Sequence, residues 1–199
     1  METEAMATTT KTRYTLAEMP EWTGFGWHYY ELLGGELVVR SAPDQPHAVA
    51  VVSLVLFLGE AQKAGHGRVQ TAPRAVALDW AKHGLQSEDV PYPDVLFVRE
   101  TRRSILQRAV EAAPDLVIEV LSPSTRKDDL PGGRKFAIYE RYGVPYYWTV
   151  DTEARTITQY TWSDGRYGTP LVLHPGDVLS CPLFPGVECD AIEIFAELL

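Results

Sequence analysis

A single glutamate interrupts an apolar run in the segment "DLVIEVLSPSTRKDD" at residues 115–129. Leu116, Val117 and Ile118 precede Glu119, and two more apolar residues follow it. Such a run is typical of a strand buried on both faces of a sheet. A buried carboxylate costs several kcal/mol unless another group pairs with it or a metal ion takes up its charge. Glu119 therefore needs either a cationic partner or a metal ion.

Two Pro-Asp steps precede Glu119, and each offers a second carboxylate. Asp115 lies four residues before Glu119 on the same expected strand, which separates the two by roughly 13 Å. Two carboxylates that hold one Mg²⁺ ion at about 2.1 Å must lie within a few ångströms of each other, so Asp115 is excluded. Asp94 opens the short apolar strand "DVLFV". It can share an ion with Glu119 if the two strands are neighbours.

The helix expected after this strand supplies a lysine that could lie beside Asp94 and Glu119. The residues three, four and seven positions after Lys135 are Ile138, Tyr139 and Tyr142. These spacings place all four on one helical face, and the large side chains turn that face toward the core. Helical side chains lean toward the N-terminus, so the Lys135 ammonium can reach back to the end of the strand that holds Glu119.

Asp94, Glu119 and Lys135 together are the residue types that metal-assisted cleavage of a phosphodiester requires. The carboxylates hold Mg²⁺, and the lysine orients the attacking water. Other chemistries fit the sequence poorly, because it has no G-x-S-x-G, no glycine-rich phosphate loop and no zinc-ligand spacing.

Each of these residues also has a purely structural interpretation. Glu119 and Lys135 can form a buried ion pair, Asp94 can cap a turn, and Lys135 can extend to solvent. His47, at the start of an apolar helical segment, is most simply a helix cap or a packed surface histidine.

The elements that must position these residues form a mixed α/β domain, with a central sheet between helices. A capping box at Thr15 and Glu18 indicates a short helix, and Gly34 and Gly35 indicate a hairpin within "YELLGGELVVR". The expected helices are residues 47–64, residues 129–142 and a segment at the C-terminus. The expected strands are "RVQTAPRAVALDW" with an irregularity, "DVLFV", "DLVIEVLS", "YYWTVD" and "TITQYTW". We expect residues 1–14 to be disordered and residues 15–199 to form one domain.

Length and composition fit an ordinary globular protein of 199 residues. The N-terminal segment has no apolar signal-peptide core, and the most apolar stretch is too short to cross a bilayer. A cytoplasmic protein is the simplest interpretation. Cys181 and Cys189 have no metal-ligand spacing, and whether they form a disulfide is left open.

The formal net charge of −9 argues against a surface coated with basic residues for nucleic-acid binding. The segment from Arg99 to Arg141 nevertheless carries +2, and the remainder carries −11. This distribution fits either a solvated surface of mixed charge or a basic rim around an acidic site. The rim residues expected to meet phosphates are Arg102, Arg103, Arg126, Lys127 and Arg134.

Four blocks of sequence together resemble the Uma-two family of restriction endonucleases, which belongs to the PD-(D/E)xK nuclease-like superfamily. The blocks are "GGELVVRSAPDQPHAVAV", "PYPDVLFV", "PDLVIEVLSPSTRKDD" and "KFAIYERYGVPYYWTVD". The resemblance runs from about Tyr30 to Asp151, and "FPGVECDAIEIF" matches the end of the family.

The resemblance implies a restriction-endonuclease-like core and a divalent-metal site at Asp94 and Glu119. The usual superfamily motif places a lysine two positions after the glutamate, where this chain has Leu121. Lys135 on the following helix resembles the relocated lysine of a variant motif. His47 matches the histidine that opens the first long helix of the family, and it is expected to line the site.

The sequence thus predicts a Mg²⁺-dependent endonuclease that hydrolyses DNA, with Mn²⁺ as a possible substitute ion. The metal ligands would be Asp94, Glu119 and the carbonyl of Val120. Two alternatives stay open: a non-catalytic interaction domain that keeps the nuclease fold, and a hydrolase of small phosphate esters. We also expect a homodimer, and the aromatic-rich segment at residues 139–162 could pack either a core or the interface between two copies.

Overall fold

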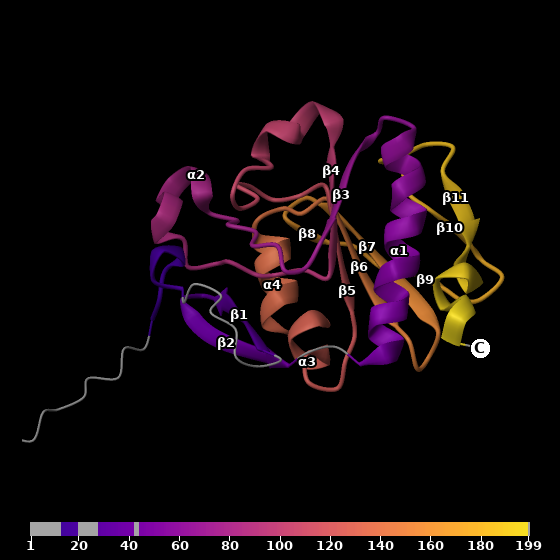
Figure 1. Cartoon of the computed structure of the whole chain (residues 1–199), viewed down its shortest axis with the longest axis horizontal. Helices are drawn as coiled ribbons and strands as arrows, with labels where there is room; N and C mark the ends of the chain where they lie inside the picture. Colours follow the sequence, from indigo (N-terminus) through magenta and orange to yellow (C-terminus); the bar gives the residue numbers. More distant parts are fainter. Residues whose placement is uncertain (1–12, 20–27, 42–43, 199) are drawn as a thin grey trace, which may run out of the picture.

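The computed structural model describes residues 13–19, 28–41 and 44–198. Its centre is a seven-stranded sheet in the order β3-β4-β5-β6-β7-β8, with β9 paired to β7. Neighbouring strands are antiparallel except β5 and β6, which are parallel. Helix α1 covers one face of the sheet and α4 covers the other (Figure 1). The mixed α/β fold with a central sheet between helices is therefore confirmed.

Two further antiparallel pairs lie outside this sheet, namely β1 with β2 and β10 with β11. The strands are β1 His28–Leu33, β2 Glu36–Ser41, β3 Gly67–Thr71, β4 Val95–Arg99, β5 Leu116–Val120, β6 Tyr146–Asp151, β7 Thr156–Ser163, β8 Arg166–Tyr167, β9 Leu171–Leu173, β10 Val178–Ser180 and β11 Glu188–Asp190. The α-helices are α1 Gln45–Lys63, α2 Trp80–His83, α3 Arg126–Asp129 and α4 Arg134–Arg141. The 3₁₀ helices are η1 Leu16–Glu18, η2 Gly84–Gln86, η3 Glu100–Ile105 and η4 Ala191–Leu198.

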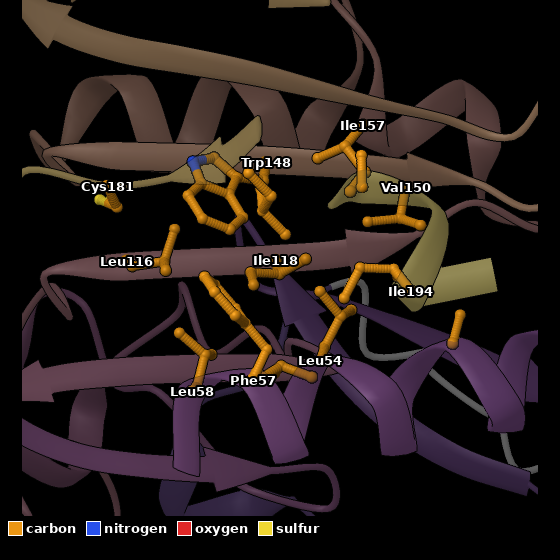
Figure 2. Close-up of a cluster of buried hydrophobic side chains, with 14 of the residues drawn as sticks. Leu54, Phe57, Leu58, Leu116, Ile118, Trp148, Val150, Ile157, Cys181 and Ile194 are labelled. Carbon is orange, nitrogen blue, oxygen red and sulfur yellow. The ribbon is translucent and has the colours of Figure 1, made fainter. Parts of the chain in front are cut away.

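Alternation along β5 divides its side chains between two apolar layers. Leu116, Ile118 and Val120 face α1 and η4, where they join Trp148 and Leu54 in one buried cluster (Figure 2). Val117 faces the opposite layer, which α4 and the tyrosines of β6 to β8 fill. Because side chains alternate along a strand, Glu119 lies on the α4 side with Val117.

Helix α1 begins and ends close to where the sequence predicts. Asp44 caps it by accepting a hydrogen bond from the His47 backbone amide at 3.0 Å, and Pro46 lies in its first turn. Gly65 follows the helix with φ of +84°, a conformation that glycine adopts without strain. The cap fixes His47 in the first turn of α1.

The single helix expected over residues 129–142 is wrong. The chain instead forms the short α3 and then α4, with a turn between them. Pro131 disfavours a helical conformation in the residue before it, and Gly132 has φ of +89°. The break matters for the site, because it lets α3 and α4 present different side chains from different directions.

The aromatic-rich segment packs the core. Tyr139, Tyr147 and Tyr160 of this segment are buried between α4 and the sheet. Their rings contact one another and the ring of Tyr167 on β8. The segment is therefore used inside the domain, and the expected homodimer stays a prediction. Residues 1–12 of the segment expected to be disordered lie outside the described residues.

Both cysteines are free thiols in the structure. Burial raises the pKa of Cys181 and that of Cys189 to about 12. At pH 8 we expect native protein to react with a disulfide reagent such as DTNB on the order of 10³-fold more slowly than a free thiol, because only the thiolate reacts. Unfolding in guanidinium should restore the normal rate for both thiols. A native thiol that reacts at the free rate would contradict this burial.

Candidate functional site

Asp94 and Glu119 meet because β4 and β5 are antiparallel neighbours. Val95 pairs with Ile118 and Leu96 pairs with Val117. Continuing this register by one residue places Asp94, immediately before β4, opposite Glu119. Directly opposed residues in an antiparallel pair have Cβ atoms about 4.5–5.5 Å apart and point to the same face. The neighbouring strands that the argument from sequence required are therefore present.

Asp94 is held by two donors from different elements. Its Oδ2 accepts a hydrogen bond from the Val120 backbone amide at 2.8 Å and lies 3.1 Å from His47 Nε2 on α1. Burial lowers the pKa of His47, but the hydrogen bond to Asp94 and its negative charge outweigh burial, so the net shift is upward. The carboxylate of Asp94 is thus fixed at the point where α1, β4 and β5 converge.

Glu119 is almost completely buried, and two side chains of α4 bind it. Its Oε1 lies 2.7 Å from Lys135 Nζ and accepts a hydrogen bond from the Tyr139 hydroxyl, also at 2.7 Å. Burial raises the pKa of Glu119 well above its usual value; the Lys135 ammonium opposes this shift, and the charges of Asp129 and Asp94 add to it. The four-residue spacing of Lys135 and Tyr139 brings both groups to one carboxylate.

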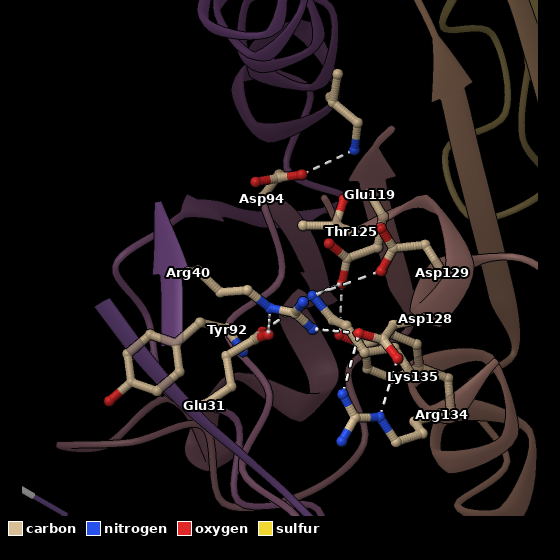
Figure 3. Close-up of polar contacts among 12 residues, drawn as sticks. Glu31, Arg40, Tyr92, Asp94, Glu119, Thr125, Asp128, Asp129, Arg134 and Lys135 are labelled. Carbon is tan, nitrogen blue, oxygen red and sulfur yellow. Dashed lines mark hydrogen bonds and ion pairs between the residues drawn. The ribbon is translucent and has the colours of Figure 1, made fainter. Parts of the chain in front are cut away.

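Lys135 is as buried as Glu119 and contacts a second carboxylate. Its Nζ lies 3.0 Å from Glu31 Oε1 on β1 and 3.9 Å from Asp129 Oδ1 on α3 (Figure 3). Glu31 Oε1 also accepts a hydrogen bond from the Tyr92 backbone amide at 2.9 Å. The ammonium therefore joins β1, α3, α4 and β5.

A chain of ion pairs continues from Glu31 through Arg40 and Asp128 to Arg134. Arg40 Nε lies 2.6 Å from Glu31 Oε2, and the same guanidinium reaches Asp128 Oδ2 at 3.0 Å. Arg134 Nε lies 2.9 Å from Asp128 Oδ1. Burial tends to raise the pKa of Asp128, but its hydrogen bonds to Arg134 and Arg40 lower it overall.

Glu31, Arg40, Asp128 and Asp129 join Glu119 and Lys135 in one cluster of charged side chains. None of these four residues was predicted from the sequence to belong to the site. The sequence around Glu31 resembles that around Glu119, because Glu31 is a single acidic residue within the apolar segment "YYELL". This pattern could have indicated a buried carboxylate that needs a partner. The adjacent acids Asp128 and Asp129 gave no such signal, because they lie in a polar, charged stretch.

The chain matches the family model "Uma2: Putative restriction endonuclease" over residues 17–192. The chain belongs to the Uma2 family. Among solved structures, a similar one is described as "a putative nuclease belonging to DUF820 from Anabaena variabilis ATCC 29413". The two share 18% sequence identity with a TM-score of 0.71, over 93% of this chain and 99% of that chain. This likeness shows the fold of the chain. A search of curated proteins found no match.

In this Uma2 domain, the amine that reaches Glu119 does not come from the position two residues after it. Leu121 stands two residues after Glu119, and the amine that reaches Glu119 comes from Lys135 on α4. The structure thus places Asp94 opposite Glu119 in the sheet, with His47 in contact with Asp94 and Lys135 in contact with Glu119, whereas Asp115 lies at the opposite end of β5. There it binds Arg99 at 2.8 Å and Arg102 at 3.0 Å.

The expected basic rim of the Uma2 domain is largely engaged with carboxylates. Arg102 binds Asp115, Arg126 binds Asp151, and Arg134 binds Asp128. Arg103 makes an ion pair with Glu100 at 3.4 Å, and Lys127 is exposed. A phosphate would therefore have to compete with existing ion pairs at most of these positions.

The charges of the cluster do not balance. Five carboxylates, Glu31, Asp94, Glu119, Asp128 and Asp129, face the three cationic side chains Arg40, Arg134 and Lys135. With all five carboxylates ionised and His47 neutral, two negative charges are in excess. Burying such charge is costly, which is why burial raises the pKa of Glu119 and that of Asp129. Hard oxygen donors with excess negative charge fit a divalent cation such as Mg²⁺ or Mn²⁺. Among the described residues, no three acidic, histidine or cysteine side chains are already arranged around one ion position.

Among the described residues, no helix is long and apolar enough to cross a membrane.

Proposed function

We propose that this Uma2 protein is a Mg²⁺-dependent endonuclease that hydrolyses phosphodiester bonds of DNA, with Mn²⁺ able to replace Mg²⁺. One observation carries the proposal: Asp94 lies opposite Glu119 in the sheet register, and the Lys135 ammonium lies 2.7 Å from Glu119. The three side chains come from distant parts of the sequence and converge where negative charge is in excess.

In this proposal Asp94, Glu119 and the Val120 carbonyl hold the cation. When bound, a divalent cation activates water and stabilises negative charge on the phosphate. The Lys135 ammonium orients the attacking water and neutralises charge beside it. His47 lines the site and fixes the Asp94 carboxylate through the 3.1 Å contact, as hydrogen-bonding partners of metal ligands commonly do.

The direct test is cleavage of supercoiled plasmid by purified protein with Mg²⁺ or Mn²⁺. We expect cleavage that EDTA abolishes and that Glu119→Gln reduces at least 100-fold (about 3 kcal/mol of transition-state stabilisation). Glu60→Gln is the matched control, because Glu60 is an exposed carboxylate on α1, and it should cleave like wild type. Equal cleavage by wild type and Glu119→Gln would show that the activity belongs to a contaminant.

One observation favours the alternative of a non-catalytic interaction domain. The Lys135 ammonium already forms an ion pair with Glu119 Oε1, so the charged cluster can stabilise the fold without a metal ion. Calorimetry with Mn²⁺ separates the two functions. Binding that Asp94→Asn weakens supports the nuclease, and absence of binding at millimolar Mn²⁺ supports the interaction domain.

A further inference from the structure

Asp129 is the one carboxylate of the cluster that the internal ion pairs leave largely unused. Its side chain is 1% exposed, and neither carboxylate oxygen has a hydrogen-bond partner among the described residues. The nearest cation is Lys135 Nζ at 3.9 Å, and that ammonium is already bound by Glu119 and Glu31 at shorter distances. The Thr125 hydroxyl is near enough to lower the pKa of Asp129, but it makes no hydrogen bond of good geometry.

Two backbone hydrogen bonds hold Asp129 in place, even though its carboxylate accepts none. Its backbone carbonyl accepts a hydrogen bond from the buried Tyr147 hydroxyl at 2.7 Å, and its amide donates to the Thr125 carbonyl at 3.3 Å. The side chain lies beside those of Glu119 and Lys135 (Figure 3). Burial raises the pKa of Asp129 to about 6, with a smaller contribution from the charge of Asp94, and the charge of Asp129 in turn adds to the rise in the pKa of Glu119.

The neighbouring residue shows what a structural aspartate looks like at this place. Asp128 is buried to a similar degree, but Arg40 binds one of its oxygens and Arg134 binds both. Burying Asp129 without such partners lowers the stability of the fold, since an unsatisfied buried polar group costs about 1–3 kcal/mol. A costly, rigidly placed and unsatisfied acid beside a proposed metal site indicates a ligand position.

We propose that Asp129 is a third carboxylate ligand of the divalent-cation site, and that the carboxylates of Asp94, Glu119 and Asp129 turn toward the ion as it binds. Among the described residues, no three acidic, histidine or cysteine side chains surround one ion position beforehand. This inference rests on the proposed function, because it assigns a further ligand to the same cation. The ligand set then contains oxygen donors from the residue before β4, from β5 and from α3. The break between α3 and α4 has a role in this arrangement, since it lets α3 supply the acid and α4 supply the lysine.

The test compares Asp129→Asn with Asp128→Asn, two changes of identical chemistry at adjacent residues. Calorimetry with Mn²⁺ measures binding, and thermal unfolding measures stability with EDTA and with Mn²⁺. We expect Asp129→Asn to weaken Mn²⁺ binding at least tenfold while its melting temperature in EDTA stays equal to or above that of wild type. We expect Asp128→Asn to melt below wild type in EDTA, because it breaks ion pairs with two arginines, and to keep its Mn²⁺ affinity within about threefold.

Equal Mn²⁺ affinity in Asp129→Asn and wild type would overturn the ligand role and leave the proposed function standing. A loss of stability in EDTA as large as that of Asp128→Asn would also overturn it, because Asp129 would then be a structural residue. If wild type binds no Mn²⁺, the proposed function fails, and the ligand role fails with it.

Discussion

Lys135→Met is expected to lower the free energy of unfolding by about 3–5 kcal/mol, the usual effect of removing one partner from a buried ion pair. Methionine keeps the length and apolar stem of lysine, so the change isolates the charge. The variant leaves Glu119 and Glu31 without the ammonium that lies 2.7 Å and 3.0 Å from them. Urea denaturation measures the loss.

A double variant separates the ion pair from general packing. Glu119→Gln combined with Lys135→Met removes both charges, so its destabilisation should be smaller than the sum of the two single variants. Lys127→Met is the control, because Lys127 is exposed on α3, and it should stay within about 0.5 kcal/mol of wild type. A Lys135→Met protein as stable as the control would show that the ammonium does not hold this cluster together.

The loss in Lys135→Met should also shrink as the pH falls from 8 toward 5. Burial already raises the pKa of Glu119, and Lys135 opposes that rise, so its removal raises the pKa further. The folded state then binds a proton more tightly than the unfolded chain does. Lowering the pH between the folded and unfolded pKa values therefore favours the folded state. A loss of stability that is constant over this range would mean that removing Lys135 does not change the protonation of Glu119.

Gly133→Ala is expected to destabilise the protein by about 2–3 kcal/mol, because an added methyl group has no room. A Cβ at Gly133 would lie 2.2 Å from the Lys127 carbonyl oxygen and 2.5 Å from that of Asp128. Both atoms are backbone, so α3 and α4 would have to separate. The φ of Gly133 is −84°, so the effect comes from the clash and not from backbone strain.

The matched control for this change is Gly59→Ala within α1. A Cβ at Gly59 meets no atom within 4 Å, and alanine favours a helix interior over glycine by about 0.5–1 kcal/mol. We expect Gly59→Ala to be neutral or stabilising, and chemical denaturation of both variants checks the pair. If Gly133→Ala were as stable as Gly59→Ala, α3 and α4 could move apart without loss of folding free energy. The turn between them would then not fix the position of Lys135.

The sequence alone determined the elements whose patterns are local. The apolar run around Glu119, the spacing of Lys135 and Tyr139, and Gly65 after the long helix each gave the correct element. A strand's alternation and a helix's period of 3.6 depend only on nearby residues. The same local reasoning excluded Asp115, since distance along one strand is fixed by the chain.

Only the tertiary structure decided which charges share the cluster. Glu31 and Arg40 come from a hairpin outside the main sheet, and no local pattern says that the hairpin lies against α4 and reaches Lys135. Likewise, Asp128 and Asp129 are adjacent acids that the sequence cannot tell apart. One is bound by two arginines and the other lies unsatisfied beside Glu119. Contacts between distant segments depend on how whole layers pack, so they cannot be deduced from the neighbours of any one residue.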